Sequence, residues 1–81
     1  MVYVDNMRAA YRGMVMCHMI ADTEAELHHM ADRIGIARRW YQGNHYDICL
    51  AKRRLAVKAG AQEVTRLELG RILWNRRKEA R

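Results

Sequence analysis

The stretch GAQEVTRLEL, residues 60–69, decides the fold because it joins two helices through a short strand. Gly60 is suited to the left-handed conformation that ends a helix. The helix that it ends is predicted over residues 48–59, with Asp47 as the N-cap. Residues 61–64 are then expected to form a short strand, because they lie between a helix-ending glycine and a new helix start.

The start of the next helix is marked by two local motifs. Thr65 and Glu68 have the spacing of a capping box, in which each residue bonds the backbone of the other. Val64 and Leu69 flank it as a hydrophobic staple. These motifs predict a third helix over residues 66–78, which carries a basic tail.

The same signals occur earlier in the chain. Thr23 and Glu26 form another capping box, and Gly35 follows at the end as a C-cap. Between them lies one apolar helical face, consisting of Leu27, Met30, Ala31 and Ile34. A first helix is therefore predicted over residues 24–34.

Strands are predicted between these helices. Residues 2–4 and 36–41 are rich in β-branched and aromatic side chains. Residues 6–13 read as a loop, and residues 14–20 suit either a strand or a buried helical turn. Strands that alternate with helices favour right-handed crossovers. We therefore expect one α/β domain over residues 1–81, with a small, mainly parallel sheet of three to four strands packed by about three helices.

Composition narrows the class of protein. The two cysteines form no CxxC pair, and the N-terminus carries no signal-peptide pattern, which predicts a reduced, cytoplasmic protein. The most apolar run, residues 14–21, is too short to span a membrane. No membrane association is expected.

Positive charge is concentrated in the second half of the chain. Residues 1–40 carry five basic and five acidic side chains, whereas residues 41–81 carry ten and four, which accounts for the net charge of +6. Such an excess suits phosphate-bearing or acidic partners, although basic runs on helices are often only solvated faces. The candidate nucleic-acid contacts are Arg38, Arg39, Arg54, Lys58, Arg76 and Arg77.

The predicted topology also places a candidate site. If the sheet is parallel, the strand ends meet at one rim, where open α/β sheets bind ligands. The side chains expected to contribute to ligand binding there are Asp5, His18, His28, Gln42, His45, Tyr46, Asp47, Lys52 and Arg53. Two of them also have a structural interpretation: Asp47 could serve only as an N-cap, and His45 only as a turn residue.

Metal binding and catalysis are left open by the residues. Asp5, His18, His45 and Asp47 supply suitable ligand types, but no zinc-finger spacing occurs, so no metal ligand is assigned. The sequence has no phosphate loop and no HExxH motif. Whether the protein is an enzyme, and which cofactor it uses, therefore stays open.

Several stretches resemble one known family. They are VYVD, CHMIADTEAELHHMADRIG, RRWYQ, HYD and KRRLAVKAGAQEVT, in collinear order over nearly the whole chain. They are similar to the small bacterial and phage proteins called domain of unknown function 4031. The resemblance implies a phage or prophage origin and no established activity. The family often has a second acid after the first aspartate, whereas this chain has Asn6.

Three functions are consistent with these observations. The first is binding of nucleic acid or a nucleotide at the strand-end rim. The second is inhibition of a host defence protein through the basic surface. The third is a metal-dependent phosphodiesterase or nuclease that uses Asp5, His45 and Asp47, with His18 as ligand or base. The oligomeric state is not predicted.

Overall fold

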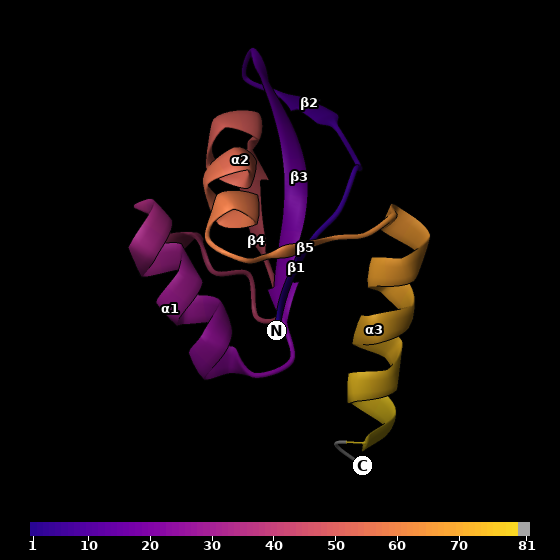
Figure 1. Ribbon diagram of the computed structural model, residues 1–81. Coiled ribbons are helices and arrows are strands. Elements are labelled where there is room, and N and C mark those ends of the chain that lie inside the picture. The colour runs from indigo at the N-terminus through magenta and orange to yellow at the C-terminus, as the bar shows by residue number, and fades with distance from the viewer. Residues whose placement is uncertain (80–81) are drawn as a thin grey trace.

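The computed structural model describes the backbone of residues 1–79 and the side chains of residues 1–76. Over this range the chain forms a five-stranded mixed sheet and three α-helices (Figure 1). The strands are β1 (Val2–Val4), β2 (Ala9–Tyr11), β3 (Met14–Ala21), β4 (Tyr46–Cys49) and β5 (Gln62–Glu63). The helices are α1 (Glu24–Ile34), the short 3₁₀ helix η1 (Arg38–Trp40), α2 (Leu50–Lys58) and α3 (Arg66–Glu79).

The long strand β3 is the centre of the sheet. Its residue Met19 pairs with Val4 of β1 and with Tyr46 of β4, so β1 and β4 lie on opposite edges of β3. Near the other end of β3, β2 pairs antiparallel with it on the same edge as β1. The last strand, β5, lies parallel to β1 on its far side.

The prediction of a mainly parallel sheet was wrong, because two antiparallel strands went unrecognised. β2 lies inside the predicted loop 6–13 and turns into β3 through Arg12 and Gly13, whose φ angles are 49° and 77°. Two positive φ angles match the twist of a tight hairpin, which makes the pair antiparallel. Among the strand pairs of the described chain, only β1 and β5 run parallel.

The second unrecognised strand is β4, and its presence makes the predicted start and N-cap of the second helix wrong. Asp47 is not an N-cap but the second residue of β4, and α2 begins at Leu50 after Cys49. The alternation of buried Tyr46 and Ile48 is the strand pattern that was missed. Because β4 occupies the edge of β3 opposite β1, residues 36–41 do not pair with β3, and they form a loop and η1 instead.

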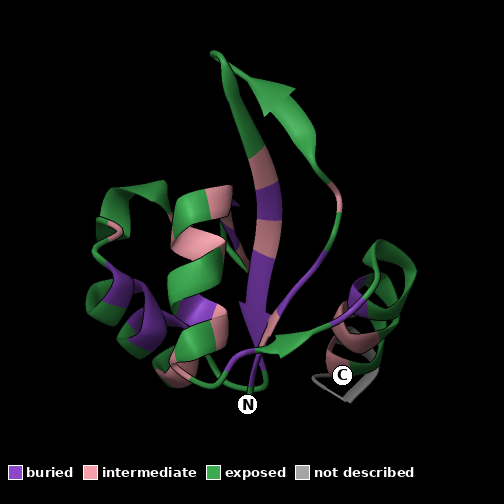
Figure 2. Cartoon of the chain, turned by 45° about the horizontal axis from the view of Figure 1, so that its top comes forward, coloured by how far each residue is buried: buried purple, intermediate pink, exposed green. Residues whose placement is uncertain are grey.

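The sheet separates two apolar layers of unequal size. Helices α1 and α2 cover one face and α3 covers the other (Figures 1 and 2). The buried residues on the first side are Val2, Val4, Met19, Ala21, Leu27, Met30, Ala31, Ile34, Tyr46, Ile48, Ala56 and Ala61. Under α3 the buried set is Ile20, Val64 and Leu69, with Tyr3, Ile72 and Leu73 packed against it. The helix α3 is therefore held by a much smaller core than α1 and α2.

The predicted helix starts of α1 and α3 are confirmed. Thr23 Oγ1 accepts a hydrogen bond from the Glu26 amide at 3.2 Å, and Gly35 ends α1 with φ 83°. At α3, the Glu68 amide donates to Thr65 Oγ1 at 3.1 Å and the Thr65 amide donates to Glu68 Oε1 at 2.9 Å. None of the helices in the described part of the chain is long and apolar enough to span a membrane.

Candidate metal centre

Strand pairing brings His18 and Asp47 together on the α3 side of the sheet. The two residues are direct partners in the antiparallel pair of β3 and β4. Side chains alternate along a strand, so His18 shares its face with Ile20, which packs under α3. The same alternation sends Tyr46 and Ile48 to the opposite layer.

Asp5 lies directly behind His18 and fixes its orientation. Its carboxylate is fully buried and accepts hydrogen bonds from the backbone amides of His18 (2.7 Å) and Met7 (3.3 Å). Its second oxygen lies 2.8 Å from His18 Nδ1. Because a carboxylate only accepts, the ring proton must sit on Nδ1. In the neutral ring, His18 Nε2 then carries the free lone pair.

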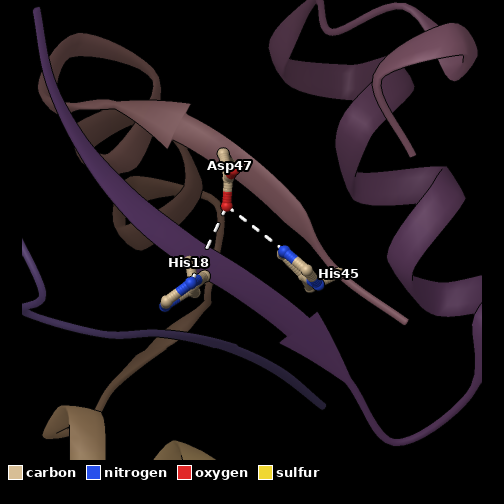
Figure 3. A group of neighbouring side chains, drawn as sticks. All are labelled: His18, His45 and Asp47. Carbon is tan, nitrogen blue, oxygen red and sulfur yellow. Dashed lines mark ion pairs between the residues drawn. The ribbon is translucent and has the colours of Figure 1, made fainter. Parts of the chain in front are cut away.

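His45 is held in the same manner by its neighbour in the turn. Asn44 Oδ1 lies 2.6 Å from His45 Nδ1, so this nitrogen is again the donor and Nε2 carries the lone pair. On the other side of the site, Gln42 Nε2 donates to Asp47 Oδ2 at 2.7 Å. The remaining oxygen of Asp47, Oδ1, is thereby directed toward the two imidazoles (Figure 3).

One nitrogen from each imidazole and one oxygen of Asp47 therefore lie close together. Asp47 Oδ1 lies 3.3 Å from His45 Nε2 and 3.8 Å from His18 Nε2, and all three atoms lie within 4.8 Å of one another. Asp47 Oδ1 is buried and has no hydrogen-bond partner. A buried acceptor without a donor is costly, and three facing lone pairs repel one another. We call these three residues the histidine–aspartate cluster.

The separations of Asp47 Oδ1 from the two imidazole nitrogens, 3.3 and 3.8 Å, are close to those between the ligands of a transition-metal ion. With bonds of about 2.0–2.1 Å in a tetrahedral arrangement, neighbouring ligand atoms lie roughly 3.4 Å apart. Metal-bound histidines usually donate their other ring nitrogen to a carboxylate or carbonyl oxygen, as His18 does to Asp5 and His45 does to Asn44. Burial lowers the pKa of His45, an effect that the Asp47 carboxylate partly offsets, so the neutral ligand form is favoured.

The cluster opens into a pocket beneath α3. The pocket has a volume of about 270 Å³ and is lined by His18, Asn44, His45, Arg66, Leu69, Gly70 and Leu73. Asn6 connects the loop after Asp5 to this helix, because its Oδ1 accepts a hydrogen bond from the Arg66 amide at 3.0 Å. Asn44, Arg66 and Gly70 were not predicted as site residues. The one available signal was Gly70, a glycine inside an otherwise helical pattern.

Two other predicted ligand-binding residues lie in the opposite layer. Tyr46 is fully buried and its hydroxyl lies 2.7 Å from His28 Nδ1, while His28 Nε2 lies 3.1 Å from the Glu24 carboxylate. The Glu24 carboxylate can only accept, so His28 donates a hydrogen bond from Nε2. In the neutral ring, Nδ1 then accepts a hydrogen bond from the Tyr46 hydroxyl. Burial raises the pKa of Tyr46, consistent with a neutral phenol. The sheet separates His28 and Tyr46 from the histidine–aspartate cluster.

Lys52 and Arg53 both bond to backbone carbonyl oxygens. Lys52 Nζ donates to the carbonyl oxygen of Ile34 at 2.8 Å, at the C-terminal end of α1. Arg53 Nε donates to the Asp5 carbonyl oxygen at 2.8 Å and Arg53 Nη1 to Glu63 at 2.8 Å. Arg53 therefore supports the backbone at Asp5, from which the site is built.

The candidate nucleic-acid contacts are divided between the two layers. Arg38 and Arg39 lie on η1, Arg54 and Lys58 on α2, and all four are exposed. Arg76 is on α3, across the sheet, where Nη1 donates to the Ala21 carbonyl oxygen at 2.6 Å. The side chain of Arg77 lies outside the described residues. These positions do not form one continuous strip along a single layer (Figure 1).

Fold and site together define a small α/β protein with two histidines and an aspartate converging beneath a helix. The family model described as "Protein of unknown function (DUF4031)" matches residues 2–76, and the chain belongs to this family. Comparison with curated proteins and with solved structures gives no match.

Proposed function

We propose that this protein binds phosphate-bearing ligands through a divalent metal ion held by the histidine–aspartate cluster. The observation that carries the proposal is the convergence of one ligand atom each from His18, His45 and Asp47, of which Asp47 Oδ1 is buried without a hydrogen-bond partner. A divalent cation at this point would satisfy all three lone pairs. It would also offset the cost of burying the unpartnered oxygen.

The ligand atoms indicate the class of metal. Two imidazole nitrogens and one carboxylate oxygen suit zinc, iron(II) or manganese, whereas magnesium and calcium prefer oxygen ligands alone. Three protein ligands leave a coordination position for water or a substrate oxygen. That position would face the pocket beneath α3, because the pocket is lined by both histidines.

The charge around the pocket supports an anionic ligand. Among the residues that line it, Arg66 carries the one fixed positive charge and there is no acidic side chain. The chain as a whole carries a net charge of +6. A phosphate oxygen could therefore bind the metal ion while a second oxygen pairs with Arg66.

Hydrolysis of a phosphodiester is the second candidate function, favoured by the free coordination position. A bound divalent ion lowers the pKa of water to about 7 and so supplies hydroxide at neutral pH. The hydroxide oxygen would bond to phosphorus as the bond to the leaving oxygen breaks. One product keeps the phosphate, and the leaving alkoxide takes a proton from solvent. The pocket lining offers no further acid for that proton, which is why we place binding first.

Metal titration tests the proposal directly. Metal-free protein should bind one equivalent of zinc by calorimetry, and the His45→Ala and Asp47→Asn variants should lose this binding. His29→Ala is the matched control, because His29 is exposed on α1 outside the cluster. Absence of zinc binding in the wild type, or unchanged binding in His45→Ala, would refute the site. Release of nitrophenolate from bis(p-nitrophenyl) phosphate then separates hydrolysis from binding alone.

A further inference from the structure

Gly70 occupies a position in α3 where the fold gives no reason for a glycine. It lies in the second turn of a helix that spans Arg66–Glu79, where glycine is less favourable than alanine. It is not among the glycines with positive φ. A Cβ atom added at Gly70 would meet no atom within 4 Å. Neither backbone conformation nor close packing therefore requires a glycine here.

What Gly70 does provide is space beside the histidine–aspartate cluster. It lines the pocket together with His18 and His45, between the apolar side chains of Leu69 and Leu73. A longer side chain at this position would narrow the pocket. The helix α3 therefore contributes an open apolar wall opposite the proposed metal ligands.

The pocket combines three chemistries at short range. The cluster would supply the metal ion, Arg66 supplies a positive charge one turn before Gly70, and the leucines supply an apolar surface. Inorganic phosphate would use the first two and leave the apolar wall unoccupied. A nucleotide would use all three, because its base or sugar presents a flat, partly apolar surface next to the phosphate.

The depth of the site limits the form of that nucleotide. The side chains of His18 and His45 are only 25% and 22% exposed, so a phosphate must enter the pocket to reach them. Phosphates of a duplex lie on a rigid outer surface, and their bases are paired and stacked inside it. An unpaired nucleotide can place its base against the half-buried Leu73 beside Gly70, whereas a duplex cannot do so without unpairing.

We propose that Arg66, Gly70 and Leu73 make α3 the nucleotide-binding wall of the site, which accepts a mononucleotide or an unpaired strand in preference to a duplex. This inference rests on the proposed metal-dependent binding of phosphate. The shared ligand chemistry is a phosphate with an unpaired base. A free nucleotide and a single strand are its two sources.

The test uses zinc-loaded full-length protein and four probes: inorganic phosphate, adenosine monophosphate, a short single-stranded oligonucleotide and the same oligonucleotide as a duplex. Adenosine monophosphate should bind about tenfold more tightly than inorganic phosphate, because burying part of the base against the apolar wall removes roughly 60 Å² of apolar surface from water, worth about 1.4 kcal/mol. The single strand should bind more tightly than the duplex. Tighter binding of the oligonucleotide than of the mononucleotide identifies a strand as the source, and the reverse identifies a free nucleotide.

Variants of α3 separate the parts of the wall. Gly70→Leu should remove the advantage of the nucleotide over phosphate while zinc affinity stays unchanged. Gly70→Ala should raise the melting temperature by a few degrees, about the amount expected from better helix propensity. Arg66→Gln should weaken phosphate and nucleotide binding by a similar factor. Arg71→Gln is its matched control, because Arg71 is exposed on the same helix and does not line this pocket.

The outcomes distinguish this inference from the proposed function. The protein could bind zinc and yet bind phosphate and nucleotide with equal affinity, or single strand and duplex with equal affinity. Either result would overturn the inference, whereas the metal site would remain supported. Normal nucleotide binding by Gly70→Leu would also overturn it. A wild-type protein that binds no zinc would overturn the proposed function and this inference with it.

Discussion

The buried carboxylate of Asp5 contacts His18 through both of its oxygens. Oδ2 lies 2.8 Å from His18 Nδ1, and Oδ1 accepts a hydrogen bond from the backbone amide of His18. One residue thus fixes both the strand position and the ring tautomer of a proposed metal ligand. This arrangement leads to a specific prediction for a substitution that changes few atoms.

Replacing Asp5 by Asn should reduce metal affinity and leave the fold in place. The amide oxygen can still accept from the His18 backbone, but the amide nitrogen would face Nδ1 and favour a proton on Nε2, toward Asp47. We expect zinc affinity to fall by about 10- to 100-fold. Calorimetry measures this, and Asp22→Asn is the control, because Asp22 is exposed and its carboxylate contacts Tyr3 and the N-terminal ammonium group rather than the cluster. Wild-type affinity in Asp5→Asn would contradict the assigned tautomer.

Zinc should stabilise the folded protein. A ligand that binds only the native state raises its stability by RT ln(1 + [L]/Kd), which gives about 2.7 kcal/mol at one hundred times Kd. The melting temperature should therefore rise on addition of zinc and return on chelation. Asp47→Asn should melt at the same temperature with and without zinc. A rise of equal size in that variant would show that the metal binds elsewhere.

Loss of either capping threonine should weaken the fold by about 1 kcal/mol. Thr23→Ala and Thr65→Ala each remove the acceptor for a helix-start amide, at Glu26 and Glu68 respectively. Urea unfolding followed by circular dichroism measures the change. Substitution by Ser, which keeps the hydroxyl, should restore most of the stability. If Ala and Ser behave alike, the hydroxyl contributes nothing.

Acid should loosen the start of α3. Hydrogen bonds from the Thr65 backbone and side chain hold the pKa of Glu68 below its usual value. A lowered folded pKa means that the contribution is present above the unfolded value near 4.5 and is lost as the pH falls through the folded pKa. The protection of the Thr65 amide from hydrogen exchange, relative to its intrinsic rate at each pH, should fall over that range, and Glu68→Gln should remove this change. If the pH dependence of protection at the Thr65 amide is the same in Glu68→Gln, a titrating group other than Glu68 causes it.

Lys52 should contribute more to the stability of the fold than other basic side chains of α2 do. Its ammonium group bonds the Ile34 carbonyl at the negative end of α1, so Lys52→Gln should cost about 1 kcal/mol. Arg54→Gln removes the same charge from an exposed position in the middle of α2, away from a helix end, and should leave stability unchanged. Equal effects of the two substitutions in urea unfolding would mean that net charge, rather than the helix contact, is responsible.

Local motifs predicted the helices well and the sheet poorly. Capping boxes and the C-terminal Gly35 act within one turn of the chain, so their spacing is sufficient to locate α1 and the start of α3. Pairing in the sheet depends on which strands meet β3, and that choice involves residues far apart in the sequence. The four-residue strand β4 was hidden because Asp47 also fits a helix cap.

The sequence analysis placed Asp5, His45 and Asp47 near one another, but the sheet brings them together through a different strand arrangement from the predicted one. Asp5, His45 and Asp47 were expected to meet because parallel strands end at one edge. They meet instead because β3 pairs antiparallel with both β1 and β4, which aligns Val4 and Tyr46 across Met19. The neighbours on α3 could not be anticipated, since their position depends on how that helix packs over the sheet.

The unequal division of the core has a consequence for local unfolding. Among the described side chains, Ile20, Val64 and Leu69 form the buried cluster under α3, whereas twelve buried residues lie under α1 and α2. Detaching α3 therefore exposes far less apolar surface than opening the other layer. We expect α3 to be the cooperative unit that opens at the lowest free energy, with amide protons that exchange while the β3 ladder stays protected. Such an opening would give solvent and ligands access to the histidine–aspartate cluster without global unfolding.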